Sequence, residues 1–198
     1  MMFHPDLCEA VATALKHRTI EAHQELESLL IPKLHVVHTK VEYAQLLATF
    51  YGYFAPVEKL IGQFITPEHL PDIIQRRKAA YLLNDLARLD VRSESLSLST
   101  YLPQIENEAQ AWGALYVLEG STLGGRGITK MLLKQCPQLT VDELSFFNGY
   151  REATGPMWTS FQKTLNDLGY TSQELSIIVG SANDTFLKFK QWIQQSMA

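Results

Sequence analysis

Two features of this sequence have residue types and spacing that could do chemistry: a dense glycine cluster and a histidine on an apolar helix face. The cluster reads EGSTLGGRG from Glu119 to Gly127, inside a segment that otherwise favours helix. Each glycine in a helix interior costs about 1 kcal/mol relative to alanine. Projected at about 100° per residue, Gly113, Gly120, Gly124 and Gly127 share one face. That face would let a flat ligand or a second helix lie directly against its backbone.

The histidine is His23, which projects into the apolar sector of the first predicted helix. Thr19, one turn earlier, is small enough to leave room for a ligand. Glu27, one turn later, could hold the second ring nitrogen directly or through water. A neutral imidazole that faces a cavity is a competent iron ligand. A hydrogen-bonded core histidine beside a solvated Glu27 is the alternative that the residues leave open.

A flat cofactor between the two helices would account for both features. A porphyrin could be held by His23 through its iron and approached from the other side by the glycine-lined helix. Ser121, at the edge of the glycine face, offers a hydroxyl for a water network near a diatomic ligand. The alternative, in which the glycines serve only tight helix–helix packing, also stays open.

Apolar positions recur at helical spacing almost throughout, which predicts an all-α, single-domain protein spanning residues 1–198. Capping-box spacings at Thr39–Glu42 and Thr171–Glu174 mark the starts of two helices, and Pro32 is expected to follow the end of the first. The polar stretch SESLSLST predicts a connection. Helices are predicted near residues 5–30, 39–62, 71–89, 103–134, 142–150, 155–168 and 171–195.

Composition and charge exclude several classes of protein. The net charge of −4 argues against broad nucleic-acid binding and against attraction to anionic membranes. No stretch approaches the roughly 20 apolar residues that span a bilayer, and the N-terminus lacks the pattern of a secretory signal. Cys8 and Cys136 are unpatterned, which fits a reducing compartment and predicts a cytoplasmic location.

A phosphate-binding loop is the competing interpretation of the glycine cluster. Gly120 and Gly125 have the outer spacing of such a loop, and ALYVL before them could be a buried strand. The loop requires a lysine followed by serine or threonine, which serve the phosphates and magnesium. Arg126 and Gly127 stand there instead, so the sequence disfavours a nucleotide site.

At the level of motifs, the chain resembles the haem oxygenases, in particular the bacterial branch associated with bacteriophytochromes. LKHRTIEAHQELE resembles the proximal-ligand segment of that family, and GALYVLEGSTLGGRGI resembles its distal helix. FFNGYREATGPMW and ANDTFLKFKQW resemble later segments of the same branch. The likeness spans nearly the whole chain, and the distal segment is its most specific motif. The fold that it implies is a haem-oxygenase-like helical bundle.

The resemblance also implies roles for individual residues. His23 would be the proximal iron ligand, while Gly120, Ser121 and Gly124 would lie at the reacting face of the ring. Together with Thr19 and Glu27, which helical spacing places beside His23, the predicted haem contacts are Lys16, Thr19, His23, Glu27, Tyr116, Gly120, Ser121, Gly124, Gly125 and Phe186. A bent distal helix would restrict which meso carbon is attacked.

Some of these positions have alternatives. Lys16 could pair with a haem propionate or be a solvated lysine, and Arg126 could be a surface residue. Tyr116 could hydrogen-bond a propionate or fill the core. Many family members carry an aspartate directly after the first distal glycine, where this chain has Ser121. A serine hydroxyl is uncharged, so the water network near oxygen must be arranged differently, as in the bacteriophytochrome-associated branch.

The reaction implied by the resemblance is O2- and electron-dependent cleavage of haem, both substrate and cofactor, to biliverdin, CO and ferrous iron. An electron donor such as ferredoxin or a flavoprotein reductase would serve it, and a bacteriophytochrome would accept the biliverdin. A haem carrier that has lost catalysis is a second possibility. A thiaminase-type enzyme of the same architecture is a third, for which Cys8 and Cys136 are poor nucleophile candidates.

Overall fold

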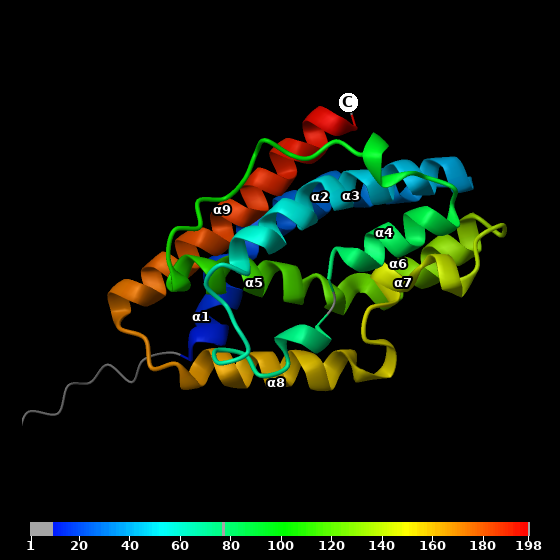
Figure 1. Cartoon of the computed structure of the whole chain (residues 1–198). Helices are drawn as coiled ribbons and strands as arrows, with labels where there is room; N and C mark the ends of the chain where they lie inside the picture. Colours follow the sequence, from blue (N-terminus) through cyan, green and yellow to red (C-terminus); the bar gives the residue numbers. More distant parts are fainter. Residues whose placement is uncertain (1–9, 77, 198) are drawn as a thin grey trace, which may run out of the picture.

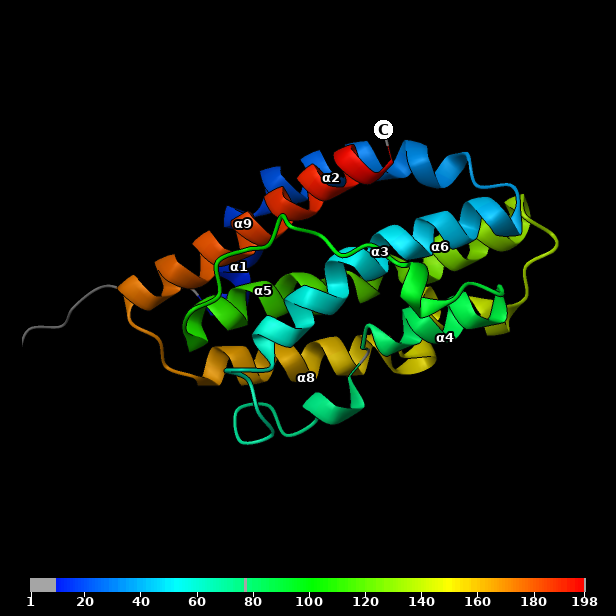
Figure 2. The ribbon, with the colours of Figure 1, turned by 45° about the horizontal axis from the view of Figure 1, so that its top comes forward.

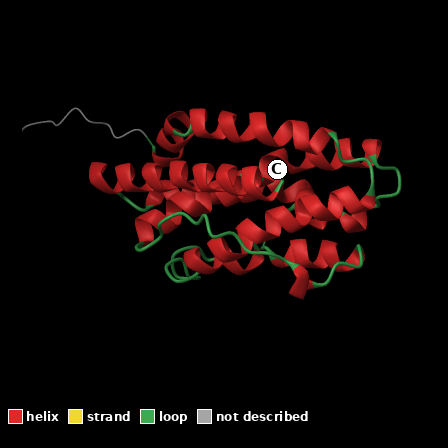
Figure 3. Ribbon diagram, turned by 90° about the horizontal axis from the view of Figure 1, so that it is seen from above, coloured by secondary structure: helices red, strands yellow, loops and turns green. Residues whose placement is uncertain are grey.

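The computed structural model describes residues 10–76 and 78–197, and every regular element within them is a helix (Figures 1 and 3). The predicted all-α class is confirmed. The α-helices are α1 Val11–Arg18, α2 Ile20–His35, α3 Lys40–Ile61, α4 Ala80–Arg88, α5 Glu108–Gly120, α6 Thr122–Gln135, α7 Ser145–Asn148, α8 Thr154–Asp167 and α9 Ser172–Ser196. Short 3₁₀ helices lie at Ile73–Gln75 (η1), Ser93–Ser95 (η2), Val141–Glu143 (η3) and Arg151–Ala153 (η4). No helix in the described ranges is long and apolar enough to cross a membrane.

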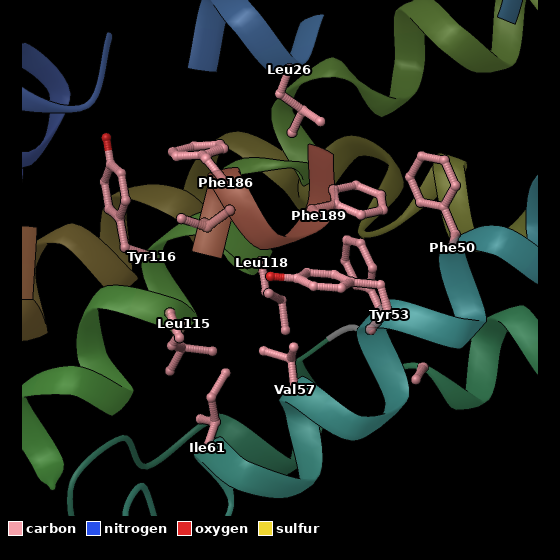
Figure 4. Packing of buried hydrophobic residues seen from close by; sticks show 14 of the residues in the cluster. Leu26, Phe50, Tyr53, Val57, Ile61, Leu115, Tyr116, Leu118, Phe186 and Phe189 are labelled. Carbon is pink, nitrogen blue, oxygen red and sulfur yellow. The ribbon is translucent and has the colours of Figure 1, made fainter. Parts of the chain in front are cut away.

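A continuous hydrophobic cluster forms the core, and α5 lies at its centre (Figure 1). Side chains of α3, α5 and α9 meet there, as Figure 4 shows for Val57, Leu115 and Phe189. The rings of Tyr53 and Phe189 stack with their centroids 4.7 Å apart. Tyr53 also donates a hydrogen bond of 2.6 Å to the Thr185 carbonyl of α9. The core therefore fixes α3 and α9 against the helix that leads into the glycine cluster.

The α5–α9 contact is unusually close because small residues line it. A Cβ atom at Gly113 would lie 2.2 Å from the Ile178 carbonyl oxygen, a distance that no side chain allows. The Ser181 hydroxyl donates to the Gln110 carbonyl at 2.7 Å. Gly113 is therefore a packing glycine, and at this position the helix–helix packing alternative is the one that holds.

The first predicted helix is interrupted in the structure. Its predicted start near residue 5 lies outside the described residues, and the helix divides at Thr19, where φ is −114° and ψ is 3°. The Thr19 hydroxyl donates to the Leu15 carbonyl at 2.7 Å and so competes with the helical backbone. α2 then continues past Pro32 to His35. Pro32 lies on the exposed side of α2, so the predicted end at residue 30 is too early.

The helix predicted over residues 103–134 is also divided, between α5 and α6 at Ser121. The Ser121 hydroxyl donates to the Leu118 carbonyl at 2.6 Å, and the Thr122 hydroxyl donates to the Glu119 carbonyl at 2.7 Å. Such bonds from side chain to preceding turn bend helices. The Ser121 amide still donates to Val117 at 3.1 Å, so the junction is a bend rather than a loop.

The region near residues 71–89 departs further from the prediction of one helix. Only η1 and α4 are helical, and Arg76 between them is extended, with φ −74° and ψ 152°. The Arg76 side chain turns inward to the carboxylates of Asp72, four residues earlier, and of Glu119 on α5, which the helix prediction did not foresee. The predicted capping boxes of α3 and α9 are both confirmed.

Adjacent glycines of α6 should respond oppositely to alanine. A Cβ at Gly125 would lie 1.9 Å from the Phe147 carbonyl oxygen, whereas a Cβ at Gly124 meets nothing within 4 Å. We expect Gly125→Ala to lower the free energy of unfolding by about 3 kcal/mol. Gly124→Ala should raise it by up to about 1 kcal/mol, because helix propensity improves without a clash. Urea denaturation measures both, and equal effects at the two positions would contradict this packing.

Candidate functional site

α2 runs beside α5 and α6 and is tied to them near both of its ends. At one end the Thr19 hydroxyl hydrogen-bonds the buried phenol of Tyr116. Burial raises the pKa of Tyr116 and the Thr19 hydroxyl offsets part of that rise, so the phenol stays neutral near pH 7. At the other end Gln135 donates to the His35 carbonyl at 2.7 Å. Between these two contacts lie His23 and Glu27, which are predicted to face a ligand.

His23 lies one turn after Thr19, with its side chain 50% exposed. It is therefore not the buried core histidine of the alternative interpretation. The Glu27 carboxylate lies 3.6 Å from its Nδ1 atom, and the two residues are one turn apart on α2. The ring of Phe186 meets the imidazole edge to face, with centroids 5.5 Å apart and an interplanar angle of 79°. With Glu27 on the Nδ1 side, Nε2 is the nitrogen left for a ligand.

α9 supports the helix that carries His23, and the two run side by side (Figure 2). Asn183 donates to the Arg18 carbonyl at 3.2 Å, just before α2 begins. Further along, Lys190 pairs with Glu25 at 2.9 Å. Phe186 lies between these contacts on the same helix, so α9 both holds α2 and contributes the ring against His23.

The glycine cluster divides into two kinds of residue. A Cβ at Gly124 or Gly127 would meet nothing within 4 Å, and one at Gly120 would meet only the ring of Trp158, at 3.6 Å. Gly125 instead faces the backbone of α7, as its short distance to the Phe147 carbonyl shows. The packing alternative thus accounts for Gly125, while Gly120, Gly124 and Gly127 form a face of bare backbone that is open at Gly124 and Gly127 and bordered by the Trp158 ring at Gly120.

The other predicted residues lie around this face or apart from it. Ser121 is exposed at the bend, with its hydroxyl donated to Leu118. Lys16 is exposed on α1, on the far side of the break at Thr19. Arg126 lies at the surface, 3.6 Å from Glu152, as the surface interpretation expected.

A buried ion cluster beneath the bend escaped the sequence analysis. Arg76 and Glu119 pair at 2.6 Å with their side chains 1% and 4% exposed. The Tyr150 hydroxyl donates to the same Glu119 carboxylate at 3.0 Å. Glu119 itself carried a signal, because a carboxylate that ends a buried apolar run such as ALYVLEG must find a partner. Nothing in the sequence identifies Arg76 or Tyr150 as that partner.

Comparison with known families identifies the chain. The model of the family described as Heme oxygenase matches residues 9–195, nearly the full length. The chain belongs to the haem oxygenase family. It is accordingly a haem oxygenase enzyme, with haem as its substrate and cofactor. The thiaminase alternative is thereby excluded; Cys136 is fully buried, and Cys8 lies outside the described residues.

Individual relatives agree with the family assignment. A curated heme oxygenase of Xanthomonas campestris pv. campestris (strain 8004) is 29% identical over 147 residues, which cover 74% of this chain and 86% of that protein. The NO- and CO-bound heme oxygenase of Neisseria meningitidis has a TM-score of 0.77 at 20% identity, covering 96% of this chain and 92% of that chain. Heme oxygenase-1 of Synechocystis sp. PCC6803, solved in complex with heme, has a TM-score of 0.71 at 18% identity, covering 94% and 92%.

The described residues fit a haem. Its flat ring needs a surface without projecting side chains, and the open face of Gly120, Gly124 and Gly127 supplies one. Its iron needs a donor atom that is accessible, and the imidazole of His23 is half exposed. Its apolar edge needs an apolar neighbour, and the Phe186 ring adjoins His23.

Filling the open face should weaken haem binding without weakening the fold. In Gly124→Leu the new side chain enters space that is empty of protein atoms. We therefore expect the free energy of unfolding to be unchanged or slightly higher. Haem binding, followed by absorbance titration, should weaken by about tenfold or more, equal to about 1.4 kcal/mol. Lys130→Leu, an exposed position on another side of α6, is the matched control and should bind normally. Equal affinity in both variants would exclude Gly124 from the haem face.

Proposed function

We propose that His23 is the proximal ligand of the haem iron and that the bare backbone of Gly120 and Gly124 covers the opposite, distal face of the ring. The observation that carries the proposal is the open space beside Gly124 and Gly127. Glycines that cost helix stability without packing against protein need another reason to be there. A half-exposed imidazole on the neighbouring helix supplies the complementary partner for a flat, metal-centred ligand.

Each neighbouring residue has a role in this arrangement. Glu27 accepts a hydrogen bond from Nδ1, directly or through water, which orients the ring and keeps Nε2 free for iron. Phe186 packs on the imidazole and against the porphyrin edge. Thr19 leaves room beside the ring. Lys16 and the phenol of Tyr116 are the candidates for contact with the propionates.

The reaction is the opening of haem to biliverdin, CO and ferrous iron, with O2 activated at the haem iron that His23 holds. The chain binds and orients the haem and restricts which meso carbon is attacked. Ser121 is exposed at the bend, and its hydroxyl oxygen can accept a hydrogen bond from water while its proton goes to Leu118. The α5–α6 bend limits which meso carbon is attacked. The close contact of Gly125 with the Phe147 backbone of α7 supports the distal helix.

The partners follow from the chemistry of the reaction. Ring opening consumes electrons, so a donor such as ferredoxin or a flavoprotein reductase serves the enzyme. A bacteriophytochrome is the proposed acceptor of biliverdin. The reducing cytoplasm is the proposed location, which suits a chain with two unpatterned cysteines.

The assignment of His23 predicts loss of its axial signature on mutation. Haem added to the wild type should give a histidine-ligated spectrum, and reductant with O2 should convert it to the spectrum of biliverdin. His23→Ala should bind haem without that axial signature and produce no biliverdin, because the donor nitrogen of the imidazole is lost. Added imidazole should restore the spectrum by binding where the side chain was.

The control is His38→Ala, which removes an exposed histidine outside the site and should behave as wild type. An unchanged axial spectrum in His23→Ala would refute the ligand assignment. A wild type that binds haem but leaves it intact with reductant and O2 would instead favour the haem-carrier alternative.

A further inference from the structure

Glu119 is a buried carboxylate one residue before the first glycine of the open face. Its Oε2 atom lies 2.6 Å from Nη1 of Arg76. The Tyr150 hydroxyl lies 3.0 Å from Oε1 and 3.1 Å from Oε2. A buried carboxylate without such partners is strongly unfavourable. The side chain is thus held by two elements that lie far from it in the sequence.

Arg76 is itself fixed from several sides. Its Nε and Nη2 atoms each donate to the Asp72 carboxylate at 2.8 Å. Its guanidinium lies 5.3 Å from the centroid of the Phe161 ring and 3.4 Å from the Met157 carbonyl oxygen, both on α8. Burial alone would lower the pKa of Arg76, but its bonds to Asp72 and Glu119 outweigh burial and raise it. The arginine therefore stays charged and links η1, α8 and the end of α5.

The backbone of Glu119 belongs to the bend. Its carbonyl accepts the Thr122 hydroxyl at 2.7 Å. Beyond the bend, Gly124 and Gly127 have no side chains that could fix the direction of α6 against a neighbour. Further along, α6 is held by Gly125 against α7 and by its buried residues Thr129 and Leu132, so Glu119 is the anchor at its start.

We propose that Glu119 is a positioning residue: clamped by Arg76 and Tyr150, it sets the direction in which the chain leaves α5. It thereby sets how close the backbone of Gly120 to Gly124 comes to the haem. The consequence for haem rests on the proposed function, whereas the clamp itself does not. The clamp acts through the backbone, and Glu119 need not touch the ring.

The clamp is tested first in the haem-free protein by amide hydrogen exchange. Glu119→Gln keeps the volume and removes the charge, and a cavity of about 50 Å³ beside the pair leaves room for water around the amide. Tyr150→Phe removes the second partner and perturbs packing less. Glu42→Gln is the matched control, because it removes a hydrogen-bonded carboxylate from the capping box of α3 and leaves Glu119, Arg76 and Tyr150 intact.

We expect amides of residues 117–125 to exchange about tenfold faster in Glu119→Gln and measurably faster in Tyr150→Phe, a tenfold change being about 1.4 kcal/mol of local stability. Amides of α9 serve as the internal reference and should not change. Glu42→Gln should leave residues 117–125 as in the wild type. Equal exchange in all proteins, or a uniform rise that includes α9, would overturn the clamp.

The consequence for haem is read from the C–O stretching frequency of the reduced, CO-treated complex, which reports on the distal surroundings. Glu119→Gln and Tyr150→Phe should shift this frequency while the axial signature of His23 stays the same. Glu42→Gln should shift neither. An unshifted frequency in the first two variants would overturn the positioning role. Failure of the wild type to bind haem would refute the proposed function instead, and the exchange result would still decide the clamp.

Discussion

The backbone contact between α5 and α9 is the constraint on which the site depends. At Gly113 the Ile178 carbonyl comes so close that a Cβ atom would lie 2.2 Å from its oxygen. From this contact α9 continues to Phe186, which packs on His23. In the other direction α5 continues to Gly120 and the open face. The two sides of the proposed haem site are therefore positioned from one shared point.

Both helices that line the site begin at a bend made by a hydroxyl group. Thr19 donates to Leu15 immediately before α2, and Ser121 donates to Leu118 immediately before α6. In each case a side chain competes for a helical carbonyl and redirects the chain within one residue. The bend before α6 is followed by glycines, so the direction of its first turns depends on contacts such as those of Glu119 and Gly125.

Much of the fold was predictable from the sequence because its signals are local. Helical periodicity gave the all-α class, and the Thr39–Glu42 and Thr171–Glu174 pairs marked two helix starts correctly. The bends at Thr19 and Ser121 were missed, since a serine or threonine inside a helix donates to its own backbone only in some contexts.

The site was predicted less evenly. His23 and the glycines stood out by residue type, but the sequence could not separate the packing role of Gly125 from the open position of Gly124, because that difference depends on where α7 lies. The pairing of Arg76 with Glu119 could not be predicted from the sequence for the same reason. Both are contacts between elements that only the folded chain brings together.

The central claim is that haem lies between His23 and the bare backbone of Gly120 and Gly124. A crystal structure of the haem-loaded protein tests it most directly. We expect iron bonded to Nε2 of His23, Glu27 on the side of Nδ1, and the opposite face of the ring against the α5–α6 bend. Iron held by another residue, or a ring bound away from Gly120 and Gly124, would contradict it.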